Sequence, residues 1–202
     1  MAAKGQDACA DAALVAAAEA FTKAHDPDPE HAFQVARTSL ALFDALSALH
    51  KLGPRERLLL HVAALMHDTG YENQPLQHHK GSRDLILSAN LQGLSAEERM
   101  MVACIARYHR GSAPDPSHKV YRDLSRKDQA RVAQLAATLR IADGLDRSHE
   151  ASTASVRVEF AGDTVRLLVR QREPNTTDIA TAIKKAALFE KVFAVRVAIM
   201  AK

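Results

Sequence analysis

The stretch HVAALMHDTGYENQPLQHHKGS, residues 61–82, ends an apolar run on a His-Asp doublet, His67 and Asp68. His78 and His79 follow closely, just before a new helical pattern begins. Two interpretations are open: a polar helix end with incidental histidines, or one half of a metal site. Imidazole and carboxylate groups are common ligands of divalent ions in proteins. The second interpretation therefore requires further histidines and acids on neighbouring helices.

Size and composition predict a globular protein with a substantial core. A chain of 202 residues can bury roughly 70% of the surface that it exposes when unfolded. Hydrophobic residues make up 47% and aromatic residues only 4%, with no Trp, so we expect a core of Ala, Leu, Val and Ile. The N-terminus lacks a signal pattern, and no run reaches the ~18 apolar residues of a membrane span. Cys9 and Cys104 lie far apart, which suits a reducing compartment. We expect a soluble, cytoplasmic protein without a membrane partner.

Helical periodicity predicts a mainly α fold, a bundle of five or six helices followed by a β-hairpin and a closing helix. Asp28, Ser95 and Ser125 are suitable N-caps for three of the helices. The main helical patterns span residues 28–53, 54–70, 78–90, 95–111 and 125–148. ASVRVEF and TVRLLVR alternate apolar and polar residues around AGD, which predicts the hairpin, and helical spacing returns over residues 176–200. An isolated hairpin is marginally stable. We therefore expect a helical domain over residues 1–150, with its core at about 28–148, and a unit over residues 151–202 in which hairpin and helix pack together.

Four residues on these helices are candidate metal ligands: His31, His67, Asp68 and Asp143. Neighbouring residues on a helix point about 100° apart, so the doublet can occupy adjacent corners of one ion in a groove. His31 and Asp143 would complete the site from facing helices, as in other helical bundles. Two imidazoles and two carboxylates suit Mn, Fe, Co, Zn, Ni or Mg. Such an ion would acidify bound water and polarise a phosphoryl oxygen.

The order of these ligands also resembles a known family. HAFQVAR, ALMHDTG and RIADGLD together resemble the H…HD…D signature of the HD-domain metal-dependent phosphohydrolases. HHKGSRDLIL, IARYHRG, LRIADGLDRSH and LFEKVF resemble the C-terminal domain of the exopolyphosphatase/guanosine pentaphosphate phosphatase (Ppx/GppA) family, over about residues 28–198. The resemblance implies one or two ions, with Asp68 as the bridge. It further implies that His79, or its neighbour His78, and His109 bind a second ion or donate to the leaving oxygen. Asp68, His79 and His109 are thus the expected catalytic residues.

The chain also departs from that family's pattern. The known phosphatase chemistry of the family lies in an N-terminal actin-like module with Gly-rich phosphate loops, and only eight glycines occur here. We therefore do not carry the exopolyphosphatase activity over. Gln34 and Gly81 stand where a charged residue and a histidine are expected.

Basic residues follow the candidate ligands along the chain and account for part of the formal net charge of +3. Guanidinium and ammonium groups beside a metal would hold phosphate oxygens, bidentately for Arg. The expected substrate-binding residues are Lys80, Arg83, Arg110 and Arg147.

Two hypotheses about function remain open at this point. The first is a metal-dependent phosphohydrolase for a phosphate ester or anhydride, with a nucleotide, a guanosine polyphosphate or polyphosphate as substrate. The second is a non-catalytic module that binds such a ligand or a partner phosphatase. The hairpin and last helix offer a surface for docking or for a homodimer. The small net charge of +3 and the 4% of aromatic residues disfavour nucleic acid as a partner.

Overall fold

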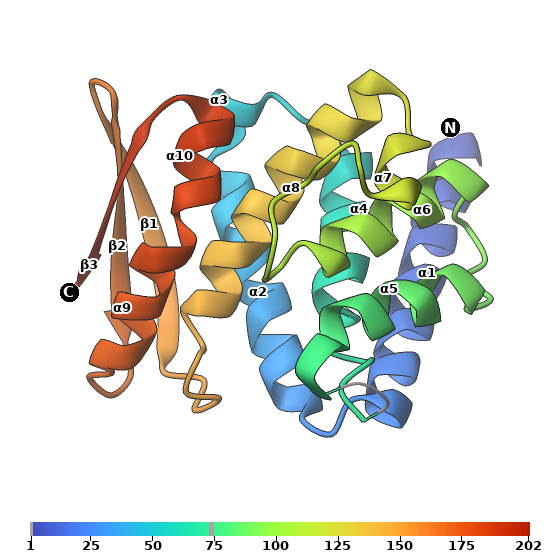
Figure 1. The fold of residues 1–202 in the computed structure, drawn as a ribbon, viewed down its shortest axis with the longest axis horizontal. Coiled ribbons are helices and arrows are strands. Elements are labelled where there is room, and N and C mark those ends of the chain that lie inside the picture. Colours follow the sequence, from blue (N-terminus) through green and yellow to red (C-terminus); the bar gives the residue numbers. More distant parts are fainter. Residues whose placement is uncertain (1, 73–74) are drawn as a thin grey trace.

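The computed structural model describes the backbone of residues 2–72 and 75–202 and the side chains from residue 8 onwards, and it is mainly helical (Figure 1). The mainly α prediction is confirmed. The helices are α1 (Ala2–His25), α2 (Pro29–Ala45), α3 (Ser47–His50), α4 (Pro54–Leu65), the 3-10 helix η1 (Pro75–Gln77), α5 (His78–Ser88), α6 (Ala96–Arg107), α7 (Lys119–Arg122), α8 (Arg126–Gly144), α9 (Thr176–Lys185) and α10 (Ala187–Phe193). The strands are β1 (Thr153–Ala161), β2 (Thr164–Gln171) and β3 (Arg196–Ala201).

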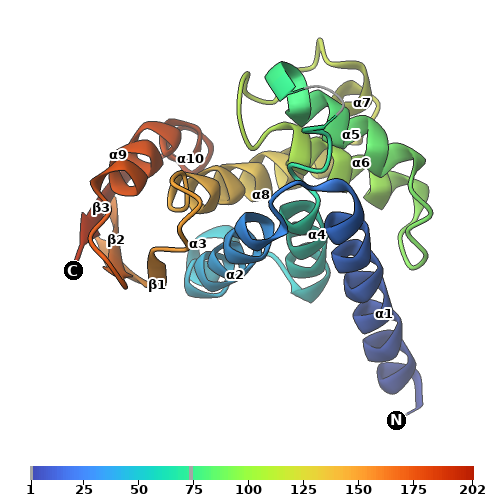
Figure 2. The same ribbon diagram turned by 90° about the horizontal axis from the view of Figure 1, so that it is seen from below.

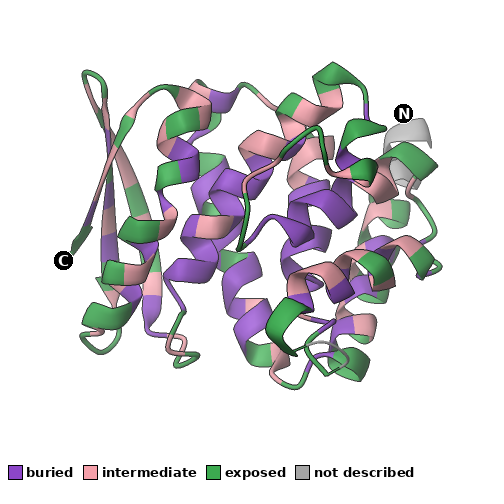
Figure 3. Cartoon of the chain, in the orientation of Figure 1, coloured by how far each residue is buried: buried purple, intermediate pink, exposed green. Residues whose placement is uncertain are grey.

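Helix α8 lies at the centre of the fold. It contacts α2, α4, α6, α9 and α10, and buried residues gather on these central helices (Figure 3). The core consists mainly of Ala, Leu, Val and Ile, as the composition predicts. Small residues bring α8 and α9 very close, because a Cβ added to Gly144 would lie 2.7 Å from the Ala182 Cα. This close approach carries α9 over the end of α8 that bears Asp143.

The three predicted N-caps are confirmed. Asp28, Ser95 and Ser125 each accept a hydrogen bond from the backbone N–H three residues later. The C-terminal end of one helix differs from the prediction, which placed it at residue 70. Helix α4 ends at Leu65, so His67 and Asp68 lie in the turns that follow the helix and not on its last turn. A turn can present neighbouring side chains to one point without the 100° separation that a helix imposes.

The C-terminal region contains the predicted hairpin, in which β1 and β2 pair antiparallel around Gly162, whose φ is 62°. The helical prediction over residues 176–200 is wrong for its last part. Ala194, with φ at 52°, ends α10 in the left-handed region, and residues Arg196–Ala201 form β3, parallel to β2. In β3 the buried Ile199 is followed by the exposed Met200, the alternation of a strand. Figure 2 shows the sheet with α9 and α10 at one end of the molecule and α1 at the other.

The domain boundary expected near residue 150 stays a prediction. Helices α9 and α10, which follow this boundary, both contact α8, which precedes it. None of the helices in the described part of the chain is long and apolar enough to span a membrane.

Candidate metal centre

The turn that carries the His-Asp doublet is packed tightly onto the start of α5. Gly70 donates its backbone N–H to the Ser82 Oγ at 3.0 Å. A Cβ added to Gly70 would lie 2.5 Å from the Gly81 carbonyl carbon and 2.6 Å from the His78 carbonyl oxygen. A side chain at position 70 would clash with this backbone, whereas a Cβ at Gly81 would lie 3.1 Å from the Gly70 carbonyl oxygen, a tight contact that a small shift relieves. Gly70 is thus needed to bring His78 to the doublet, and Gly81, which departs from the family pattern, eases the same contact.

Four histidines from four segments share one hydrogen-bonding pattern. His67, His78 and His109 each place Nδ1 at 2.7, 3.0 and 2.7 Å from the backbone carbonyl oxygen three residues earlier. A carbonyl oxygen only accepts, so each of these Nδ1 atoms carries a proton and Nε2 is the ring nitrogen that faces the Asp68 carboxylate. The Nδ1 of His31 lies 2.8 Å from the Oδ2 of Asp146, a buried carboxylate. Metal-binding histidines are commonly oriented in this way by a carbonyl or a carboxylate.

The Asp68 carboxylate lies between two pairs of these Nε2 atoms. Its Oδ2 is 4.0 Å from His31 and 3.7 Å from His67. Its Oδ1 is 3.3 Å from both His78 and His109. Two ligands bound to one ion at about 2.1 Å lie roughly 3.0–4.2 Å apart. The spacing therefore suits two ion positions, one at each oxygen of Asp68.

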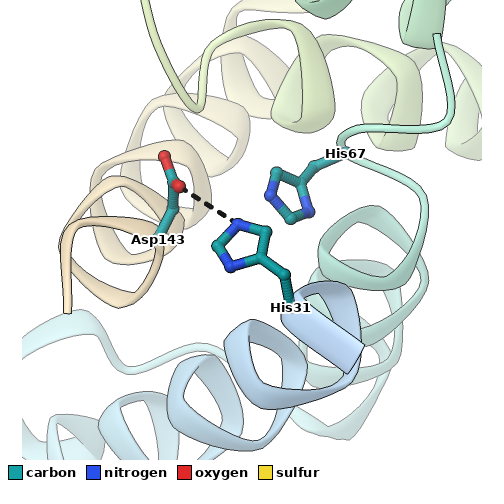
Figure 4. Close-up of side chains that lie close together, drawn as sticks. All are labelled: His31, His67 and Asp143. Carbon is teal, nitrogen blue, oxygen red and sulfur yellow. Dashed lines mark ion pairs between the residues drawn. The ribbon is translucent and has the colours of Figure 1, made fainter. Parts of the chain in front are cut away.

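Asp143, at the end of α8, completes the first of these positions. Its Oδ1 is 3.6 Å from the His31 Nε2. Figure 4 shows the imidazoles of His31 and His67 and the Asp143 carboxylate directed toward one another. Ligand atoms of His31, His67 and Asp143 all lie within 4.8 Å of one another, as do those of His67, Asp68 and His109. The structure thus brings together the four predicted ligands.

The electrostatics of the cluster suit a cation. The His31 Nε2, the His67 Nε2 and the Asp68 Oδ1 are buried without a hydrogen-bond partner among the described residues. Burial favours the neutral form of Asp68, but the charges of His67 and His109 outweigh it and lower the pKa of Asp68 to about 2. Burial likewise opposes the charged form of His31, yet the nearby Asp143 carboxylate and the hydrogen bond to Asp146 raise its pKa to about 10. The Asp143 and Asp146 side chains thus favour a proton on His31, and a metal ion could replace that proton.

A cavity of about 630 Å³ opens above the cluster. Of the predicted substrate-binding residues, Arg110 and Arg147 line it, and Lys185 of α9 joins them. Lys80 and Arg83 are not among the lining residues. Lys80 donates to the Gln77 Oε1 at 2.6 Å, and Arg83 forms an ion pair with Asp84 at 2.7 Å.

His79 does not take the position predicted for it. Its neighbour His78 contacts Asp68, because His78 is the first residue of α5 and the turn at Gly70 packs against it. The His79 ring instead lies against Gly111, where an added Cβ would be 3.3 Å from the His79 Nε2. Burial and the charge of Arg107 lower the pKa of His79 to about 4.

The sequence patterns did not predict two side chains that contact the candidate ligands, His149 and Lys185. The His149 ring stacks on His31 with centroids 3.8 Å apart, and its Nδ1 lies 2.7 Å from the Asp28 Oδ2. His149 has a φ of 61°, in the left-handed region that is rare for a residue with a side chain. Lys185 donates to the Asp143 carboxylate. The DGLDRSH segment, in which His149 follows Asp143 closely, is a signal in the sequence that could have suggested His149.

The chain matches the family model described as Ppx/GppA phosphatase, domain III, over residues 15–183. That range contains the whole histidine and aspartate cluster and both arginines of the cavity. It also covers most of the 202 residues. The chain therefore belongs to the Ppx/GppA phosphatase family and corresponds to its domain III.

Proposed function

We propose that this chain is a divalent-metal-dependent phosphohydrolase acting on a phosphate ester or anhydride. The observation that carries the proposal is the position of Asp68, whose two oxygens face two separate pairs of histidine Nε2 atoms at 3.3–4.0 Å. His31, His67, Asp68 and Asp143 would hold one ion, and Asp68, His78 and His109 a second. This is the arrangement implied by the resemblance to HD-domain phosphohydrolases. Mn, Fe, Co, Zn, Ni and Mg all suit these ligands.

The residues of the chain divide the work of binding and catalysis. A bound ion would supply Lewis acidity, which polarises a phosphoryl oxygen and lowers the pKa of water. Asp68 orients both halves of the cluster, and Asp146 fixes the tautomer and direction of His31. Arg110 and Arg147 line the cavity, where their guanidinium groups can hold the remaining phosphate oxygens and stabilise charge that develops during phosphoryl transfer.

The cavity favours a small phosphorylated molecule as substrate. Its volume of about 630 Å³ lies within the usual range for small-molecule sites. A nucleotide, a guanosine polyphosphate or a short polyphosphate would fit a cavity of this size that Arg110, Arg147 and Lys185 help to line. The last two are suggested by kinship with the Ppx/GppA family.

One observation favours a second candidate, a non-catalytic module that binds a phosphorylated ligand or a partner phosphatase. The Lys185 ammonium donates to Asp143, one of the carboxylates that an ion would need. An ion must displace this contact or share the carboxylate with it. If it does neither, the cavity remains a binding site with two arginines but without a hydrolytic centre.

Phosphate release separates the two candidates. The purified chain would be incubated with Mn, Co, Ni, Mg or Zn and with nucleotides, guanosine polyphosphates, short polyphosphates and a chromogenic phosphate ester. Asp68→Ala should abolish turnover, whereas Asp84→Ala, which removes an exposed carboxylate paired with Arg83, should retain it. Folded protein without turnover under any metal would overturn the hydrolase. Ligand affinity in that case would support the binding module.

A further inference from the structure

Arg107, at the C-terminal end of α6, is buried without a countercharge. Arg107 is only 6% exposed, and its Nε and Nη1 have no hydrogen-bond partner in the described part of the chain. Among residues 8–72 and 75–202, no carboxylate forms an ion pair with it. Burying an unpaired charge is costly, and buried polar groups normally find partners. These two N–H groups therefore call for an anion or ordered water.

The Arg107 guanidinium lies over the Tyr108 ring, 5.5 Å from its centroid, and several groups on the adjoining segments are cationic or unpaired. The His79 Nδ1 is buried without a partner. Burial and the charge of Arg107 lower the pKa of both His79 and His118. The positive charge of Lys80 lowers the pKa of both histidines further. Arg83 acts on His118 and lies one helical turn after His79 on α5. We call these five residues, His79, Lys80, Arg83, Arg107 and His118, the Arg107 cluster.

The carboxylates of Asp84 and Asp115 act on this cluster from exposed positions. Lys80 donates to a neutral amide, that of Gln77, and Arg83 pairs with an exposed carboxylate, that of Asp84. The Tyr108 hydroxyl lies 2.8 Å from the His118 Nδ1 and adds a polar group beside the cluster. Three of the five residues lie on α5, Arg107 ends α6 and His118 precedes α7, and α6 packs against both α5 and α7 (Figure 2).

We propose that the Arg107 cluster binds a phosphate-sized oxyanion at a site separate from the metal centre. A tetrahedral oxyanion offers acceptor oxygens for the Nε and Nη1 of Arg107, which together form one edge of the guanidinium fork. The buried, unpartnered Nδ1 of His79 offers a further hydrogen bond, while Lys80 and Arg83 supply positive charge from the same helix. The inference does not depend on the proposed hydrolysis, because none of the five residues contacts Asp68.

Thermal unfolding of the whole chain in the presence of a chelator tests the site without any metal. A ligand that binds only the native state stabilises it by mass action. Phosphate at about ten times its Kd should raise the Tm by roughly 3–6 °C for a chain of this size. Sulfate should act similarly, and chloride at equal ionic strength should not. A Tm that none of the oxyanions moves would overturn the proposal.

Variants assign the effect to Arg107. Arg107→Met removes the charge but keeps much of the apolar stem, so its Tm without phosphate should equal or exceed that of the wild type while the phosphate response disappears. Arg122→Gln, at an exposed arginine, should keep the full response. The double variant Arg110→Gln/Arg147→Gln should keep it too. A response lost in that double variant and retained in Arg107→Met would place the anion in the main cavity and overturn the proposal.

A measurement on the wild type covers the case in which Arg107→Met fails to fold. Phosphate titrated into the labelled, metal-free chain should shift the NMR signals of the His79 and His118 rings and leave those of His31 unchanged. The reverse pattern would overturn the proposal. A parallel titration with glycerol 2-phosphate identifies the source of the anion. Binding of the ester supports a phosphoryl group of a larger ligand, and binding of inorganic phosphate alone supports the free ion.

Discussion

Replacing Gly70 with Ala should separate the two halves of the metal centre. The added Cβ would lie 2.5 Å from the Gly81 carbonyl carbon and 2.6 Å from the His78 carbonyl oxygen. Non-bonded carbon atoms pack at about 3.5–4.0 Å, so the turn and the start of α5 must move apart by about 1 Å. All the nearby atoms are backbone, which cannot rotate away as a side chain can.

This movement has consequences for stability and for the site. Overpacking typically costs about 1–3 kcal/mol, and we expect the upper half of that range because backbone must shift. For a chain of this length, that corresponds to a Tm lower by roughly 4–12 °C. The distance between the His78 Nε2 and the Asp68 Oδ1, now 3.3 Å, would widen by a similar 1 Å. A misplacement of this size can cost about 100-fold in rate.

Gly81→Ala provides the matched comparison. Its Cβ would meet the Gly70 carbonyl oxygen at 3.1 Å, a milder conflict. Thermal unfolding and metal stoichiometry of both variants would be compared with the wild type. We expect Gly70→Ala to lose much more stability than Gly81→Ala, and to lose the ion between Asp68 and His78. A Gly70→Ala variant with wild-type Tm and wild-type stoichiometry would refute this reasoning.

Three further predictions concern the candidate metal centre. Because the pKa of His31 is raised to about 10, the metal-free chain holds that proton at pH 7.5; calorimetry in buffers of different ionisation enthalpy should detect about one proton released per chain, and affinity should rise with pH. Lys185→Met, which frees Asp143, should tighten binding of the first ion in equilibrium dialysis; unchanged or weaker binding would contradict a competing role. His78→Ala should lose the second ion by metal analysis and His79→Ala should keep it; the opposite result would restore the original assignment to His79.

Local signals in the sequence predicted most of the helices. Three caps and the hairpin turn depend on short-range chemistry, and the structure confirms them. The last segment could not be predicted in the same way. VRVAIM contains apolar residues that suit a helix or a strand, and its strand state depends on pairing with β2, far away in the sequence.

The candidate ligands were predictable because they lie in short motifs with a fixed order. The choice between His78 and His79 was not, because it depends on where α5 begins and on the contact between Gly70 and Gly81. Lys185 was missed for a related reason. It reaches Asp143 through the close approach of α8 and α9, which no local pattern encodes.

Anomalous diffraction from crystals of the wild-type chain grown with Mn²⁺ would locate the ions directly. We expect one peak bounded by His31, His67, Asp68 and Asp143, and a second bounded by Asp68, His78 and His109. Both peaks should vanish in Asp68→Ala. Peaks elsewhere on the chain, or no peak at this cluster in well-ordered crystals, would contradict a metal centre organised by Asp68.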